Sequence, residues 1–123
     1  YWDAQDADRW NRLNPDKKTR RSFLQRQTEG ETGVFVAASD YLKVLPEGIA
    51  RQLPGPLTVL GTDGYGRSDT RQALRDFFEV DARHIAFAAL ASLAREKSLS
   101  SAAVKKARKA LAIDPDRINP LFA

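Results

Sequence analysis

Two short apolar runs, each preceded by turn-forming residues, indicate buried β-strands. The first is VFVAA at residues 34–38, which follows the glycine-containing segment 29–33. The second is LTVL at residues 57–60, which follows the turn sequence PGP at 54–56. Both runs are continuous rather than alternating, a pattern typical of strands covered on both faces. We therefore expect two short buried strands.

A helix is predicted between these two runs, over residues 41–53. Its apolar positions at helical spacing are Leu42, Leu45, Ile49 and Leu53. Ser39 or Asp40 can cap the helix by accepting hydrogen bonds from the free N–H groups of the first turn. Pro46 and Gly48 interrupt the segment, so we expect the helix to be kinked or broken. Strand, helix and strand in this order favour a parallel pair with a right-handed crossover, and the predicted fold class is α/β.

Three more helices are predicted in the second half of the chain, each after a residue that can cap it. The capping residues are Ser68 or Asp69, then Asp81, then Ser100 or Ser101. Residues 85–94 contain one residue outside the apolar and alanine set, so we expect this helix to be buried on more than one side. The sequence Asp114-Pro115 is expected to stop the last helix and to leave residues 116–123 as a tail.

The chain divides by composition into two parts. Residues 1–32 are predicted to form an N-terminal arm and a basic linker, and residues 33–123 a single α/β domain. The first 14 residues resemble a short polar helix or an arm, whose two tryptophans need an apolar surface to dock on. Residues 17–27 are compatible with a basic helix and with an extended linker, and the sequence leaves both open.

The composition excludes several classes of protein. The 123 residues include no cysteine and one histidine, which excludes disulfide scaffolds, thiol nucleophiles and multi-histidine metal centres. Hydrophobic residues make up 42% and charged residues 29%, as in soluble globular domains. No apolar run approaches the roughly 20 residues of a membrane-spanning helix, and the first residues lack the pattern of a signal peptide. We expect a cytoplasmic protein that does not bind a membrane.

The net charge of +4 is concentrated in two places, within residues 17–26 and 105–109. Residues 33–97 hold eight basic and eight acidic side chains and are neutral. The first cluster has Phe23 as its only aromatic residue, which leaves little for stacking on bases. The second lies on one side of a predicted helix, where a solvated face is the ordinary explanation. We do not expect nucleic-acid binding, whereas a basic adaptor that meets an acidic partner through residues 17–26 stays open.

The densest group of candidate functional residues follows the second strand. It consists of Asp63, Gly64, Tyr65, Gly66, Arg67, Ser68 and Asp69. In open α/β sheets ligands bind at the carboxyl ends of strands, and a glycine-containing loop before a helix can hold an anion that Arg67 would clamp. The loop matches neither the dinucleotide fingerprint nor the phosphate loop. We favour a structural turn in which Arg67 pairs with an acid, and a small-anion or nucleotide-binding regulatory module is the alternative.

The remaining candidates have simpler explanations. His84 has no partner at a spacing suited to a catalytic base, so we expect a partly exposed residue at the start of a helix. Ser39 lies outside any Gly-x-Ser-x-Gly elbow, and capping accounts for it. The residues by themselves therefore predict no catalytic, cofactor-binding or metal-binding group.

Five stretches of the sequence are similar to a known family. They are RWNRLNP at 9–15, VAASDYLK at 36–43, VLGTDGYGRSDTR at 59–71, LRDFFEVD at 74–81 and IDPDRINP at 113–120. Together they resemble the C-terminal region of the homodimeric bacterial pyruvate dehydrogenase, the thiamine-diphosphate-dependent decarboxylating component of the pyruvate dehydrogenase complex. The similarity extends in register over essentially the whole chain.

This resemblance implies a transketolase-like C-terminal domain, a three-layer α/β/α arrangement around a mostly parallel sheet, which is incomplete in this chain. It implies that the intact oxidoreductase decarboxylates pyruvate and acetylates lipoyl groups, using thiamine diphosphate and magnesium. The family's cofactor motif, activating glutamate and catalytic histidines lie in other domains, so none is transferred to this chain and no cofactor is expected on it. The implied partners are a second subunit, the rest of the polypeptide and the dihydrolipoyl acetyltransferase component.

Two departures from the family affect the expectations. Tyr65 stands where many members have phenylalanine, which keeps the ring and adds a hydroxyl. The chain is also expected to begin inside the family's domain, so its sheet would lack neighbouring strands. Because an incomplete parallel sheet exposes edges and apolar faces, we expect the isolated chain to self-associate. Residues 61–69 would then shape a loop at the subunit boundary.

Overall fold

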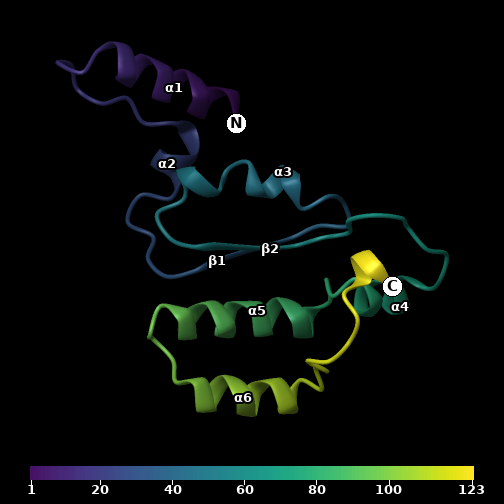
Figure 1. Ribbon diagram of the computed structural model, residues 1–123. Helices are drawn as coiled ribbons and strands as arrows, with labels where there is room; N and C mark the ends of the chain where they lie inside the picture. Colours follow the sequence, from purple (N-terminus) through teal and green to yellow (C-terminus); the bar gives the residue numbers. More distant parts are fainter.

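The computed structural model describes all 123 residues, which form a layered α/β arrangement (Figure 1). The elements are α1 (Trp2–Leu13), α2 (Phe23–Gln27), β1 (Phe35–Ala38), α3 (Val44–Glu47), η1 (Ala50–Gln52), β2 (Leu57–Leu60), α4 (Arg71–Phe77), α5 (Ala82–Arg95), α6 (Ser101–Ala110) and η2 (Pro120–Phe122), where η marks a 3-10 helix. Figure 1 shows α3 on one side of the two strands, α5 on the other, and α6 beyond α5. Helix α1 lies at the opposite end of the molecule from α6.

The two predicted strands pair in parallel, as expected from their order. Phe35 lies opposite Leu57 and Ala38 opposite Leu60, so the register holds over four residues. The ladder continues past β1, since the N–H of Ser39 donates to the carbonyl of Leu60 at 3.0 Å. The α/β class and the parallel crossover are confirmed. The sheet has two strands, so each strand has one edge without a neighbour in this chain. The prediction that both strands are buried is wrong, because their residues are half-buried and Ala38 is exposed.

The helix predicted over residues 41–53 is broken more severely than expected. Helix α3 has four residues and is followed by η1. Neither Ser39 nor Asp40 caps α3, which begins after Lys43 and has no side-chain cap. The hydroxyl of Ser39 accepts from the N–H of Tyr41 at 3.1 Å and stabilises a turn instead. Pro46 lies in the first turn of α3, where its missing N–H would have no helical partner, and Gly48 follows the last helical residue.

The capping predictions for the later helices are partly correct. Asp81 caps α5 and Ser100 caps α6, with the N–H groups of His84 and Ala103 as the donors. Helix α4 is capped by Thr70 and not by Ser68 or Asp69, which was wrong by one or two residues. The carboxylate of Asp69 instead accepts from the N–H of Thr70 at 2.6 Å. Asp69 therefore bonds the capping residue itself and not a free N–H group of the first turn.

The N-terminal segment contains two helices. The basic stretch contains both predicted structures. Residues 17–22 form a non-helical linker, and α2 follows with Ser22 in a capping box. The guanidinium of Arg20 lies 4.0 Å above the ring of Trp10, which gives that tryptophan a partner. Trp2 is 81% exposed, so the expectation that both tryptophans dock is wrong for Trp2 in this chain.

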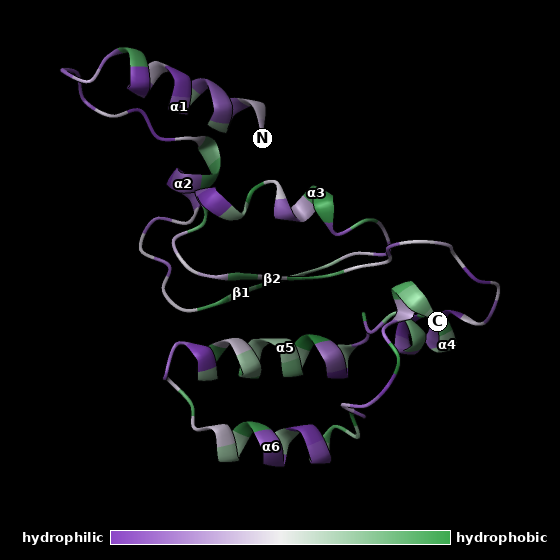
Figure 2. Cartoon of the chain, in the orientation of Figure 1, coloured by the Kyte–Doolittle hydropathy of each residue, from purple (hydrophilic) through white to green (hydrophobic).

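The chain buries few of its side chains. The fully buried residues are Ala4, Ala7, Ser22, Phe78, Val80, His84 and Ser92. The accessible surface is 9075 Å², whereas a compact monomer of 13.7 kDa exposes about 6,600 Å². Helix α5 packs against both strands on one side and against α6 on the other, so the predicted burial on more than one side is confirmed. Most of its residues are half-buried, and Figure 2 shows this helix as largely apolar. No helix is long and apolar enough to cross a membrane.

Candidate functional site

The loop after β2 is fixed at its base by the segment that follows β1. The N–H of Thr62 donates to the carbonyl of Tyr41 at 3.0 Å. Asp63 accepts from the backbone N–H of Lys43 at 3.1 Å and forms an ion pair with its ammonium group at the same distance. The backbone hydrogen bond from Lys43, and then the side-chain bond, hold the pKa of Asp63 below its ordinary value. Asp63 is therefore an ionised anchor that joins the two carboxyl-end segments of the sheet.

Two glycines of this region are required by the backbone. A Cβ on Gly61 would lie 2.7 Å from the carbonyl oxygen of Tyr41, so the close approach of the two segments leaves no room for a side chain. Gly64 has a φ of +76°, a conformation that side-chain-bearing residues rarely adopt. Gly66 has neither constraint, because a Cβ there would meet nothing within 4 Å.

The predicted ion pair of Arg67 is wrong. Its guanidinium lies 4.1 Å from the ring centroid of Phe77 in α4, and Arg67 makes no salt bridge in the chain. An arginine stacks readily on an aromatic face, so the ring replaces the expected acid. Tyr65 is 97% exposed and Ser68 is exposed as well. Of the seven predicted residues, only Asp63 lines the concave region at the carboxyl end of β2.

That concave region is a hollow of about 370 Å³ at the carboxyl end of β2, where α/β sheets commonly bind ligands. Its lining includes Lys43, Asp63, Glu79, His84, Phe87 and Arg117. The C-terminal tail closes one side of the hollow, which sequence reasoning missed because it treated residues 116–123 as a free end. Residues 113–120 contain two prolines among polar residues, which indicates turns and gave no sign that this segment lines a hollow.

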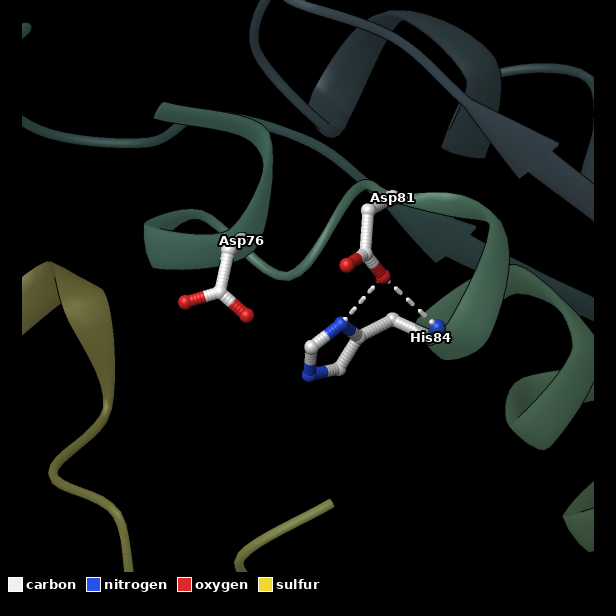
Figure 3. A group of neighbouring side chains, drawn as sticks. All are labelled: Asp76, Asp81 and His84. Carbon is white, nitrogen blue, oxygen red and sulfur yellow. Dashed lines mark hydrogen bonds and ion pairs between the residues drawn. The ribbon is translucent and has the colours of Figure 1, made fainter. Parts of the chain in front are cut away.

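His84 is 8% exposed, so the prediction of a partly exposed residue is wrong. Its ring Nδ1 lies 2.7 Å from Oδ1 of Asp81, the same oxygen that accepts the His84 backbone N–H at 3.0 Å (Figure 3). Burial alone would raise the pKa of Asp81, but the hydrogen bonds from the backbone and ring of His84 and from Arg83 outweigh it and lower the pKa to about 2. The missed signal was the three-residue spacing, which places a capping carboxylate beside the third residue of its helix.

Two arginines form hydrogen bonds with the carboxylates of this region. Arg83 bonds Asp81 through Nε at 2.9 Å and also contacts Asp76, and these bonds raise the pKa of its guanidinium. Arg117 from the tail donates to the backbone carbonyl of Asp76 at 3.1 Å and to its carboxylate at 3.3 Å. The cluster of Asp76, Asp81, Arg83, His84 and Arg117 therefore ties α4, α5 and the tail together.

This cluster does not fit a magnesium–diphosphate cofactor. Asp76, Asp81 and His84 have oxygen or nitrogen atoms within 4.8 Å of one another (Figure 3). Both carboxylates are already hydrogen-bonded to arginine, and Nδ1 of His84 is bonded to Asp81. A divalent cation would have to displace these partners and would lie beside two guanidinium charges. The geometry of the cluster is that of a structural ion-pair network.

The fold and these contacts describe an α/β segment whose polar residues mainly brace its own loops. Comparison with curated proteins shows what this segment is similar to. The chain is 41% identical over 120 residues to the pyruvate dehydrogenase E1 component of Pseudomonas aeruginosa, a match that covers 97% of the chain and 14% of that relative. The resemblance of the chain to the bacterial pyruvate dehydrogenase E1 component is thereby confirmed over nearly the whole chain.

Other E1 components give the same result. The corresponding proteins of Cupriavidus necator and Escherichia coli are 39% and 38% identical, over 97% and 98% of the chain. The chain spans about one-seventh of the length of these relatives. A search of protein-family models found no match.

Proposed function

We propose that the chain is the C-terminal structural and interface domain of a pyruvate dehydrogenase. The intact enzyme oxidatively decarboxylates pyruvate and acetylates lipoyl groups as a cytoplasmic homodimer. Residues 33–123 form the later part of a transketolase-like C-terminal domain, and residues 1–32 form an arm and linker. Thiamine diphosphate and magnesium bind to other parts of that enzyme, and this chain supplies no catalytic residue.

The observation that carries this proposal is the match to E1 components over 97% of the chain. The exposed surface supports an interface role. It exceeds that of a compact monomer by roughly 2,500 Å², and a standard protein–protein interface takes about 800 Å² from each partner. The second subunit, the rest of the polypeptide and the dihydrolipoyl acetyltransferase component are the partners we propose for this surface.

The loop of residues 63–69 is the interface element of the proposal. Its base is fixed through Asp63 and Lys43, and its far side is held by the stacking of Arg67 on Phe77. Between these two anchors Tyr65 projects with 97% of its surface exposed. A large aromatic residue held out by a fixed loop is suited to fill a pocket of a neighbouring chain.

The test uses the intact enzyme with Tyr65→Ala and Arg67→Ala. Both variants should weaken dimerisation, measured by analytical ultracentrifugation, or the retention of thiamine diphosphate. Turnover per bound cofactor should stay close to that of the parent. Arg9→Ala, a substitution of an exposed arginine in α1, is the matched control and should change neither quantity.

A collapsed turnover in a variant that keeps its dimer and its cofactor would reject the structural assignment. Saturable binding of inorganic phosphate to the loop, lost in Arg67→Glu, would instead favour the anion-binding alternative. Loss of phosphate binding at unchanged dimer stability separates the two outcomes.

A further inference from the structure

A second hollow, of about 450 Å³, lies between α5 and α6. Its lining includes Phe87, Ala91 and Ala94 from α5 and Val104, Lys105 and Arg108 from α6. It is separate from the loop after β2 and from the ion-pair cluster, and only Phe87 lines both hollows. Nothing in the proposed interface role uses it.

The spacing of these residues explains the shape of the hollow. Residues 87, 91 and 94 follow one face of α5, and residues 104, 105 and 108 follow one face of α6. The two helices pack against each other, and α6 is the outermost layer (Figure 1). Ala91 and Ala94 are too short to fill the space between the helices, which leaves an apolar floor. Lys105 and Arg108 stand at its side, and no acidic residue lines it.

Helix α6 carries an unbalanced charge. Its ten residues include Lys105, Lys106, Arg108 and Lys109 and no acid. None of these four takes part in a hydrogen bond or salt bridge of its side chain. The helix dipole favours cations in the last turn and accounts for Arg108 and Lys109. It does not account for Lys105 and Lys106 in the middle of the helix, and Lys105 repels Lys109 one turn away.

We propose that this groove binds an acidic amphipathic segment of a protein partner. An apolar side chain of that segment enters the hollow against Phe87 and Val104, and its carboxylates pair with Lys105 and Arg108. The pairing removes the repulsion on α6 and covers its apolar floor. A protein segment fits better than nucleic acid, because a single aromatic ring lines the groove and leaves little surface for the stacking of bases. It fits better than a membrane, because the apolar surface is concave rather than protruding.

The experiment measures binding of a fluorescein-labelled helical peptide of leucine and glutamate, with leucines four residues apart, to the intact polypeptide. Fluorescence anisotropy is followed at low salt and at 0.5 M salt. The variant Lys105→Glu with Arg108→Glu should weaken binding at least tenfold at low salt and reduce its salt dependence. Lys17→Glu with Lys18→Glu makes the same change of charge on an exposed segment away from the groove and should leave the affinity within twofold.

A second variant tests the apolar floor without changing the charge. Ala91→Leu fills the hollow and should weaken peptide binding about tenfold, and circular dichroism checks that α5 is retained. Equal losses in the groove variant and the Lys17/Lys18 control would show a general charge effect and overturn the proposal. Tighter binding of phosphatidylglycerol vesicles or of single-stranded RNA, lost in the same groove variant, would also overturn it. These readouts do not depend on pyruvate dehydrogenase activity, so they can fail while the proposed function stands.

Discussion

Replacing Asp81 with asparagine removes a negative charge from the start of α5 but keeps the size of the side chain and an oxygen that can cap the helix. The charge matters because Asp81 accepts from the backbone and ring of His84 and from Arg83. Its carboxylate is 20% exposed, so solvent screens these contacts only in part. We expect Asp81→Asn to destabilise the folded chain in a pH-dependent manner.

The magnitude follows from the pKa of Asp81, which is about 2 in the folded chain against an ordinary value of 3.8. This difference corresponds to about 2 kcal/mol of folding free energy. Because the folded pKa is the lower one, the unfolded chain binds more protons in this range. The stabilisation is therefore complete above about pH 4 and is lost as the pH falls toward 2.

The assay is urea unfolding of parent and variant, followed by far-ultraviolet circular dichroism between pH 7 and pH 2. At pH 7 the variant should be less stable by about 2 kcal/mol, and near pH 2 the difference should fall below about 0.5 kcal/mol. Asp116→Asn removes an exposed carboxylate from the tail and should give no comparable difference at either pH. A deficit of Asp81→Asn that stays constant across this range would refute the reasoning, because the loss would then come from capping geometry and not from charge.

Other predictions follow from the same geometry. Gly61→Ala should destabilise the chain by about 2 kcal/mol in urea unfolding, because its Cβ would meet the carbonyl of Tyr41, whereas Gly66→Ala should stay within about 0.5 kcal/mol. Equal effects of the two substitutions would contradict the close approach at Gly61. The neutral ring of His84, the single histidine, should carry its proton on Nδ1, and a ring protonated on Nε2 in ¹⁵N NMR spectra would contradict the bond to Asp81. The isolated chain should self-associate through its uncovered surface, and sedimentation of a clean monomer over a wide concentration range would count against that.

Much of the local structure could be predicted from the sequence. The apolar runs predicted both strands, and their order predicted the parallel pairing, because a helical crossover between two strands of one sheet favours that arrangement. Asp81 and Ser100 were identifiable as caps because capping depends on one side chain and the three residues after it. The family resemblance also rested on local runs of residues, above all the glycine-containing stretch after β2.

The tertiary structure alone decided which side chains meet. The stacking of Arg67 on Phe77 and the ion pair of Lys43 with Asp63 join residues 10 and 20 positions apart, and no local pattern specifies them. The burial of His84 likewise depends on the tail and on α4, which pack around it only after the chain folds. The spacing of apolar residues and the capping of helices depend on a few neighbouring residues, so both can be predicted from the sequence. Which charged side chains pair with one another depends on the distances between them, and these distances are fixed only when the chain is folded.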